Sequence, residues 1–441
     1  MPDPAADADA DPDGPGRRPA RGTRRARSPA AVRAVVQAVA VSVLGVLPAF
    51  LVGALAVQIR ADLGVGLGLF GLAAATLFAV SGALARPAGR LVQRLGSHRG
   101  AALAATLATT SLTVIGLAGS PAALMAGLAV GGLGNAVAQP SANAVLSELV
   151  TDARLGVAFG IKQSSIPAAT LLGGLAVPGV ALVFGWRWAV AGAVGLAVVL
   201  LLVSLVGGRD AGRTGPAPGP ATRAPDKGLP RGGLVVLTLG GFLGSAAATP
   251  TGVFLVDSAV AAGIDAGPAG LLFAGCSVLG LLVRIGFGWL ADRHPGRSAY
   301  LFIAHLLAAG TLGYVLLAVG PVPAFVAGSL LAYGAGWAWT GLFHFAVIRD
   351  NRGAAASVTG FVQTGLSLGA ASGPLLFGVV AQAVSYPAAW LTSAGLSLAA
   401  AVTVRVSRRM VRRSRGLPVS RLTGRRSAPP ARPAPDLAAP T

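Results

Sequence analysis

The sequence contains few of the side chains that most enzymes and metal-binding proteins use. Its 441 residues include one cysteine, Cys276, one glutamate, Glu148, and four histidines. A single cysteine excludes an intrachain disulfide and a cysteine metal cluster, and the histidines lack the close spacing of zinc ligands. We therefore expect this chain to hold no metal and no other cofactor.

Two glycine-rich motifs match enzyme signatures but lack the sequence context that those signatures need. The stretch "GLGLFG" at Gly66–Gly71 fits the dinucleotide fingerprint, but no strand is predicted before it and no acidic residue follows until Glu148. The stretch "GLSLG" at Gly365–Gly369 fits the nucleophile elbow of serine hydrolases, but no histidine follows Ser367. We therefore do not expect an enzyme.

Charged residues are also scarce. They make up 11% of the chain, whereas hydrophobic residues make up 54% and glycine occurs 63 times. The mean hydropathy is +0.71. A soluble domain of this length carries more charge and a smaller apolar fraction. The composition therefore predicts an all-α polytopic membrane protein.

Twelve hydrophobic segments of about 17 to 28 residues are long enough to cross about 30 Å of hydrocarbon as helices. We place them at 34–58, 69–85, 100–118, 122–144, 156–182, 187–206, 233–255, 268–289, 299–319, 323–347, 355–381 and 387–404. The proline- and arginine-rich ends, 1–33 and 405–441, are predicted to be a disordered head and a disordered basic tail. A flexible linker is predicted at 207–232, between six-helix units at 34–206 and 233–404.

Basic residues are concentrated on one side of this predicted topology. Most of the 35 lysines and arginines fall in the head, the tail and alternate loops, and the formal net charge is +20. The positive-inside rule places that side, with both termini, in the cytoplasm of a multi-pass plasma-membrane protein. We interpret the excess charge as contacts with anionic lipid headgroups, and we expect no nucleic acid partner.

The two halves of the chain resemble each other at an offset of about 200 residues. The stretch "GRLVQRLGSHR" at Gly89–Arg99 matches "GWLADRHPGR" at Gly288–Arg297, and "GIKQ" at Gly160 matches "GFVQ" at Gly360. Because six is an even number of spans, both halves enter the membrane in the same orientation. The sequence therefore predicts two six-helix bundles related by a parallel pseudo-twofold repeat.

These paired motifs resemble those of the major facilitator superfamily of secondary transporters, whose motif between helices 2 and 3 is Gly-x-Leu-Ala-Asp-Arg-x-Gly-Arg. The second copy keeps the acid at Asp292, and the first copy has Gln93 in its place. The resemblance covers about residues 34–404. An ion pair that exists in only one state biases a conformational equilibrium, so we expect a latch here. Asp292 and Arg293 are its candidate residues, and the predicted gating motif also includes Gly89, Gln93, Arg94 and Gly288. The alternative is that these charges only set the topology.

Polar residues inside the predicted spans are costly in lipid and tend to face other helices or an aqueous path between the halves. Lys162, about two turns into its helix, is the strongest candidate for contact with an anionic substrate. The other candidate substrate contacts are Gln163, Asn135, Gln139, Trp337, Thr340 and Gln363. Alternatively, Lys162 snorkels to the interface and the amides form interhelical hydrogen bonds.

Two further charges lie near the predicted ends of spans. Arg284 is one turn from the end of its helix, so we interpret it as a snorkelling or structurally paired cation. Asp257 lies near the external end of the seventh span, where it can serve as an entrance or gating charge. No carboxylate lies in the central part of a predicted span, so the usual proton carrier of membrane transporters is missing.

We expect a secondary transporter that moves a small organic or inorganic anion by alternating access. Efflux of amphipathic or drug-like compounds past Trp337, Trp339 and Phe361 is the alternative, and a non-transporting membrane sensor is a second alternative. The resemblance allows coupling to a proton gradient or another ion gradient, and "GIKQ" is similar to the cyanate-permease-like branch of the family. We expect a monomer whose partners are a small-molecule substrate and the lipid bilayer.

Overall fold

Helices make up nearly all of the described part of the chain. The computed structural model describes residues 29–149, 160–207, 230–293, 298–351 and 355–414. No strand occurs within these ranges. Most of the predicted head, linker and tail lies outside the described residues.

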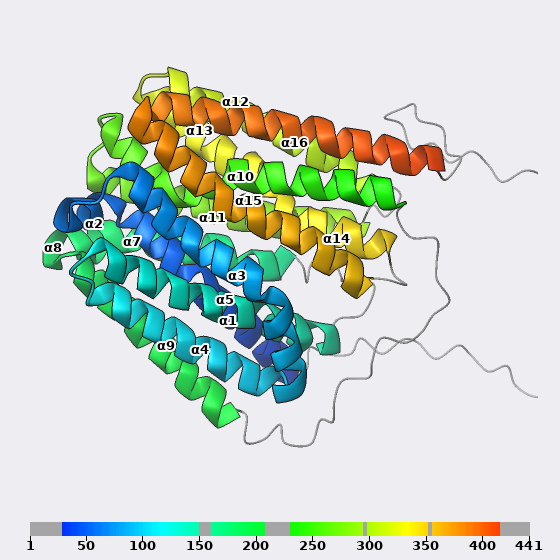
Figure 1. Cartoon of the computed structure of the whole chain (residues 1–441), viewed down its shortest axis with the longest axis horizontal. Coiled ribbons are helices and arrows are strands. Elements are labelled where there is room, and N and C mark those ends of the chain that lie inside the picture. The colour runs from blue at the N-terminus through cyan, green and yellow to red at the C-terminus, as the bar shows by residue number, and fades with distance from the viewer. Residues whose placement is uncertain (1–28, 150–159, 208–229, 294–297, 352–354, 415–441) are drawn as a thin grey trace, which may run out of the picture.

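In chain order, the helices form two series, one before and one after the predicted linker (Figure 1). The first contains α1 (Pro29–Ala54), α2 (Ala56–Leu63), α3 (Leu67–Leu95), α4 (Ser97–Gly116), α5 (Pro121–Leu149), α7 (Ser165–Ala176), the π-helix η2 (Val177–Ala181), α8 (Leu182–Phe184) and α9 (Trp186–Gly207). The second contains α10 (Arg231–Ala261), α11 (Ala266–Arg293), α12 (Ala299–Val319), α13 (Val322–Leu331), the π-helix η3 (Ala332–Trp337), α14 (Trp339–Asp350), α15 (Ala355–Ala383) and α16 (Tyr386–Ser414). We call these series the N-terminal and C-terminal halves.

Among the described residues, ten helices are long and apolar enough to cross a membrane, as expected for a multi-pass membrane protein. The other two predicted spans fall on α4 and on the run from α13 to α14, which η3 interrupts. Four threonines, at Thr106, Thr109, Thr110 and Thr113, make α4 less apolar. Each hydroxyl donates to the carbonyl four residues earlier, so all four are satisfied within the helix. The count of twelve spans stays a prediction.

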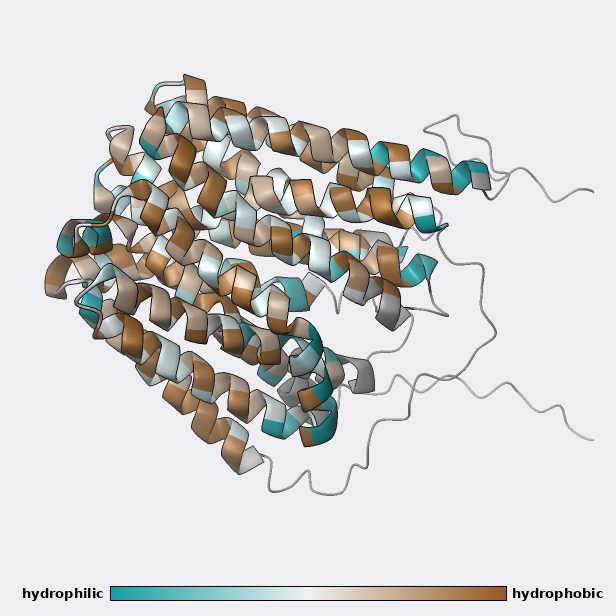
Figure 2. Cartoon of the chain, viewed as in Figure 1, coloured by the Kyte–Doolittle hydropathy of each residue, from teal (hydrophilic) through white to brown (hydrophobic). Residues whose placement is uncertain are grey.

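The bundle has two chemically different ends. At the short-turn end, connections of a few residues at 64–66, 117–120, 262–265, 320–321 and 384–385 join successive helices. The opposite end, which we call the basic end, holds the starts of α4, α10, α12 and α15 and the arginine-rich last turns of α16. Figure 2 shows hydrophilic residues gathered at the ends of α3 and α16. In both halves the first helix runs from the basic end to the short-turn end, which agrees with the predicted parallel repeat.

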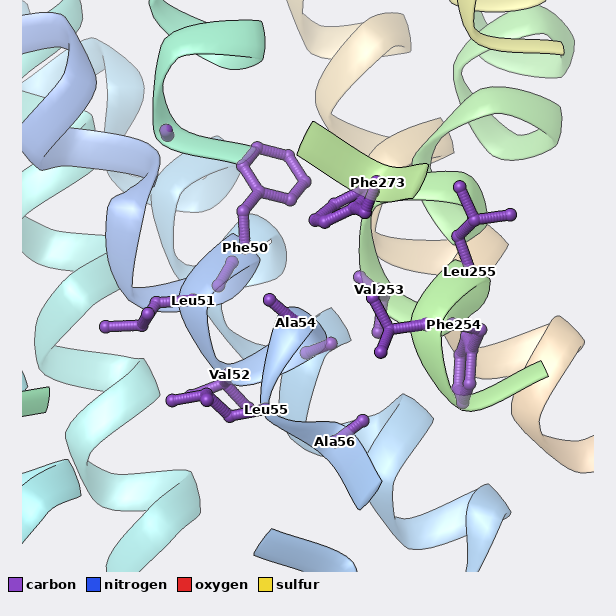
Figure 3. Packing of buried hydrophobic residues seen from close by; sticks show 14 of the residues in the cluster. Phe50, Leu51, Val52, Ala54, Leu55, Ala56, Val253, Phe254, Leu255 and Phe273 are labelled. Atoms are coloured by element: carbon purple, nitrogen blue, oxygen red, sulfur yellow. The ribbon is translucent and has the colours of Figure 1, made fainter. Parts of the chain in front are cut away.

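Three pairs of helices join the halves: α1 packs on α10, α3 on α15, and α7 on α11. Glycine allows this close approach, since a Cβ atom on Gly71 of α3 would lie 2.3 Å from the Pro374 carbonyl oxygen of α15. Apolar side chains fill the adjoining space, and Figure 3 shows Phe50 of α1 near Val253 of α10 and Phe273 of α11. Small residues let helices associate by close packing where lipid removes the hydrophobic driving force.

The last helix is longer than the sequence indicated. α16 continues to Ser414, so residues 405–414, predicted as the start of a disordered tail, are helical. The cause is a buried stripe among the arginines. The Ser407 hydroxyl donates to the Gly233 carbonyl at 2.8 Å, and both Ser407 and Val411 are buried. The spacing of four residues places these two side chains on one helical face, which packs against α10.

Candidate functional site

Two cations are buried inside the bundle where the halves meet. Lys162, in the helical turn before α7, is 6% exposed, and Arg284 of α11 is 2% exposed. Neither takes part in an ion pair among the described residues, where the pairs are Arg60–Asp257, Arg187–Asp62 and Arg349–Asp350. An uncompensated charge is costly in a low-dielectric interior. This part of the bundle therefore favours the binding of negative charge.

Backbone carbonyls from both halves hold Arg284. Its Nη1 donates to the Gln163 carbonyl at 3.1 Å, and its Nη2 donates to the Trp337 carbonyl at 3.0 Å. Its Nε is buried and has no hydrogen-bond partner among the described residues. Of the two interpretations of Arg284, the structure matches the structurally paired cation and not the snorkelling one, because the guanidinium is buried and bonded to other helices.

Replacing Arg284 by glutamine is expected to destabilise the protein. A glutamine side chain is too short to satisfy both carbonyls, and each unsatisfied buried carbonyl costs about 1 to 3 kcal/mol. The apparent melting temperature in detergent should fall well below that of the native protein. It is measured by the loss of the monodisperse elution peak. The control is Arg90→Gln, which removes an exposed arginine from α3. Equal melting temperatures for the two variants would contradict a structural role for Arg284.

A hydrogen-bonded cluster around His344 of α14 lies beside these cations. The His344 Nδ1 is 3.1 Å from the Gln163 amide nitrogen and 2.9 Å from the Thr340 carbonyl oxygen. The His344 Nε2 is 3.1 Å from the Gln363 amide oxygen. The cluster thus joins three of the predicted site residues, from both halves. His344 is a polar residue of a span predicted to line the path but is not among the predicted contacts, although its spacing of four residues from Thr340 places both on one helical face.

A second polar cluster also spans the halves. The Thr170 hydroxyl of α7 is hydrogen-bonded to the Tyr333 hydroxyl of η3, and the Ser277 hydroxyl of α11 donates to Thr170 at 2.8 Å. Trp337, at the end of η3, packs edge-on against Tyr333 and Phe50. A π-helix displaces the following residues relative to a regular α-helix and often occurs at functional sites. η3 therefore determines how Trp337, Thr340 and His344 face the N-terminal half.

The two remaining predicted contacts are bonded within the N-terminal half. Asn135 of α5 donates to the Ser81 hydroxyl of α3 at 2.9 Å, and Gln139 donates to the Asn135 amide oxygen at 3.1 Å. A Cβ atom on Gly45 of α1 would lie 2.9 Å from the same oxygen. This arrangement matches the alternative in which the amides link neighbouring helices.

The repeated charged motif begins on helices instead of in loops. Gly89, Gln93 and Arg94 occupy the last turns of α3, and Gly288 and Arg293 occupy those of α11. The α3 helix continues because Ala88 and Val92 are buried at a spacing of four residues. Gln93, Arg94 and Arg293 are exposed, and the Arg293 guanidinium stacks 4.0 Å above the Trp289 ring. The Asp292 side chain lies outside the described residues, so the predicted latch stays a prediction.

An ionic contact closes the short-turn end. Asp257 of α10 is paired with Arg60 of α2 and accepts a hydrogen bond from the Tyr386 hydroxyl of α16. Arg60 also donates from Nε to the Val65 carbonyl at 3.1 Å. Because Arg60 and Asp257 belong to different halves, the pair exists only when the halves are in contact at this end. Asp257 therefore has the position of a gating charge.

Comparison with known proteins identifies the fold. The family model described as "Major Facilitator Superfamily" matches residues 38–351. The crystal structure of the human organic anion transporter MFSD10 (TETRAN) is similar, with a TM-score of 0.63 and 19% sequence identity over 85% of this chain and 100% of the human chain. No curated protein matches the sequence significantly. At this identity, the structural likeness concerns the fold alone.

Proposed function

We propose that this chain, which belongs to the Major Facilitator Superfamily of transporters, carries a small organic or inorganic anion across the membrane by alternating access. The family consists of transporters and not of enzymes. In this proposal the two halves rock about the contacts of α1 with α10, α3 with α15 and α7 with α11. The cargo binds between the halves, beside the two buried cations, Lys162 and Arg284, and the hydrogen-bonded cluster around His344.

The observation that carries the proposal is the pair of buried cations, Lys162 and Arg284, which are without an ion-pair partner in the described part of the chain. An anion bound beside them lowers the free energy cost of burying two like charges, whereas a cationic cargo meets repulsion. The Lys162 ammonium and the Arg284 Nε supply the charged donors. Amide groups of Gln163 and Gln363 supply neutral polar groups that can orient a ligand.

The alternative cargo, an amphipathic or drug-like compound, finds less support. Trp339 is fully buried, packs edge-on against Phe343 and donates from its indole nitrogen to the Gly336 carbonyl at 3.0 Å. Phe361, by contrast, is 42% exposed. The aromatic residues predicted for that cargo therefore do not share one surface. The human neighbour is described as an organic anion transporter, which is the cargo class proposed here, although its likeness to this chain is one of fold.

The proposed location is the plasma membrane, with the basic end and both termini in the cytoplasm. The arginines of α16 lie at the basic end, where they suit contact with anionic headgroups. The short-turn end then faces outward and is closed by the pair of Arg60 with Asp257. We further propose that the protein acts as a monomer with two six-helix units. The sensor alternative has no observation in its favour.

Binding of simple anions to the purified protein tests the proposal. Sulfate, phosphate, benzoate and lactate are titrated in detergent while the apparent melting temperature is followed. A ligand that binds only the folded state stabilises it by about 2.7 kcal/mol at 100 times its Kd. We expect at least one of these anions to raise the melting temperature saturably. Lys162→Gln should abolish the shift, and Lys162→Arg, which keeps the charge, should retain part of it.

Two controls make the result specific. Arg90→Gln removes an exposed cation of α3 and should leave the anion-dependent shift unchanged. Tetraphenylphosphonium, an amphipathic cation, should produce no shift. Stabilisation by the cation alone, an anion shift that Lys162→Gln leaves intact, or no response to any of the four anions would contradict the proposal.

A further inference from the structure

His344 is buried at the contact between the two halves, and its imidazole is surrounded by groups that suit both of its protonation states. The side chain is 9% exposed. Imidazole is the side chain whose unperturbed pKa, about 6.5, allows it to gain a proton near neutral pH. No carboxylate lies in the middle of the described spans. Asp257 lies at the short-turn end and Asp350 lies at the basic end.

The hydrogen-bond partners of His344 change with protonation. In the neutral form, Nε2–H donates to the Gln363 amide oxygen, and Nδ1 accepts from the Gln163 amide nitrogen. In the protonated form, Nδ1–H donates to the Thr340 carbonyl oxygen at 2.9 Å. The Gln163 amide nitrogen would then face a donor and must rotate or withdraw. The bond from Gln163, which joins the halves, therefore fits the neutral form of His344.

The charges around His344 also link its proton to a bound anion. A positive charge on Lys162 of the N-terminal half opposes the addition of a proton to His344, and Arg284 of α11 lies close by, because it donates to the carbonyl of the same Gln163 whose amide contacts His344. The remaining titratable groups on described elements that pack against α14 or belong to it are Tyr333 of η3, Tyr300, Tyr314 and exposed His305 of α12, Cys276, Asp292 and Arg293 of α11, and Arg349 and Asp350 at the basic end of α14. α15 carries no charged residue. An anion beside Lys162 and Arg284 removes the opposition.

We propose that His344 binds one proton together with the anion, so that the carrier moves an anion and a proton as a pair. This inference rests on the proposed function, because it assigns the coupling ion of the same site. Protonation would release the Gln163 bond and so loosen the contact between the halves when the cargo is present. The proton is a substrate here and moves with the anion.

Coupled binding of a proton and an anion makes anion affinity depend on pH, which can be measured without transport. If anion binding takes up one proton, lower pH must strengthen anion binding, by up to about tenfold for each pH unit. The probes are sulfate and benzenesulfonate, whose charges stay constant between about pH 5.5 and 7.5, the range in which histidine titrates. The Kd of each probe is measured by calorimetry over this range. Repetition in buffers of different ionisation enthalpy gives the number of protons taken up.

The variant His344→Gln keeps a polar side chain of similar reach but cannot be protonated. We expect it to bind the probes with a Kd that does not change with pH and with no proton uptake. His344→Asn serves as a second variant in case the first does not fold. The matched control is His305→Gln, which removes an exposed histidine of α12 and should preserve the native pH dependence. The native protein should take up close to one proton per anion.

Gln163→Leu tests the role given to the bond between the halves. Removing the donor to Nδ1 weakens the neutral form of His344, so the midpoint of the pH dependence should move to higher pH. An unchanged or lower midpoint would overturn this assignment. The pairing of proton and anion would be overturned by anion binding in the native protein without proton uptake, or by proton uptake that persists in both His344 variants. Failure of the native protein to bind either probe, together with no response to phosphate, benzoate and lactate, would instead reject the proposed anion site.

Discussion

Replacing Gly71 by valine is expected to hold the short-turn end open and to stop transport. A Cβ atom at this position would lie 2.3 Å from the Pro374 carbonyl oxygen and 3.3 Å from the Cα atom of Gly378. These are backbone atoms, which cannot move aside as a flexible side chain can. Overpacking costs about 1 to 3 kcal/mol, which shifts a two-state equilibrium about 5- to 150-fold. α3 and α15 would therefore separate in a larger fraction of molecules.

The measurement is the distance between spin labels across the short-turn end, by double electron–electron resonance. Ala61 and Ala262 are exposed on opposite halves at this end and accept cysteine labels, in a background where buried Cys276 is replaced by alanine. Gly71→Val should give a larger population at the longer distances than the native protein has. The control is Gly195→Val on α9, where a Cβ atom meets nothing within 4 Å. A distribution that matches the native one would show that this glycine contact does not govern closure.

Asp257→Asn should open the same end by removing the ionic contact. Asp257 is 6% exposed, while the Arg60 side chain is 25% exposed, so solvent screening reduces the stabilising free energy of this ion pair. We expect Asp257→Asn to reduce the free energy that favours the closed end by about 1 to 2 kcal/mol, a value between those of exposed and buried ion pairs. This reduction changes the ratio of closed to open molecules by about 5- to 30-fold. The same labels on Ala61 and Ala262 should then show more of the longer distance. Partial recovery is expected when Arg60 and Asp257 are exchanged.

The chain provides a matched control for this charge. Asp62 pairs with Arg187 at 2.7 Å at the same end of the bundle, but both residues belong to the N-terminal half. Asp62→Asn removes an ion pair without affecting contact between the halves, so the label distances should not change. Equal effects of Asp62→Asn and Asp257→Asn would mean that loss of charge at this end, and not the contact between the halves, moves the labels.

The architecture was largely predictable because it depends on composition and repetition. Long apolar segments, the asymmetry of the arginines and the paired motifs at Gly89 and Gly288 led to a family that the comparisons confirm. The ends of helices were less predictable. Charged residues at 405–414 suggested a tail, but the apolar and small residues among them pack on α10 and extend the helix. The cyanate-permease-like branch was not confirmed and stays a hypothesis.

The candidate site was predictable only in part. Lys162, Gln163, Thr340 and Gln363 stand out because polar groups are rare in the predicted spans, and the structure places three of them around His344. The sequence alone does not show which way α14 faces, because η3 displaces the residues after it from a regular helix. The role of Arg284 depends on the backbone carbonyls of Gln163 and Trp337, and contacts between segments so far apart in the chain cannot be derived from the sequence.

The most direct test of the central claim is anion exchange in proteoliposomes. Vesicles containing the native protein are loaded with an unlabelled anion from the set of sulfate, phosphate, benzoate and lactate, and entry of the labelled anion is followed. We expect transient, saturable accumulation of label with at least one of them, and its loss in Lys162→Gln. Flux of an amphipathic cation such as tetraphenylphosphonium, with no exchange of any of the four anions, would contradict it.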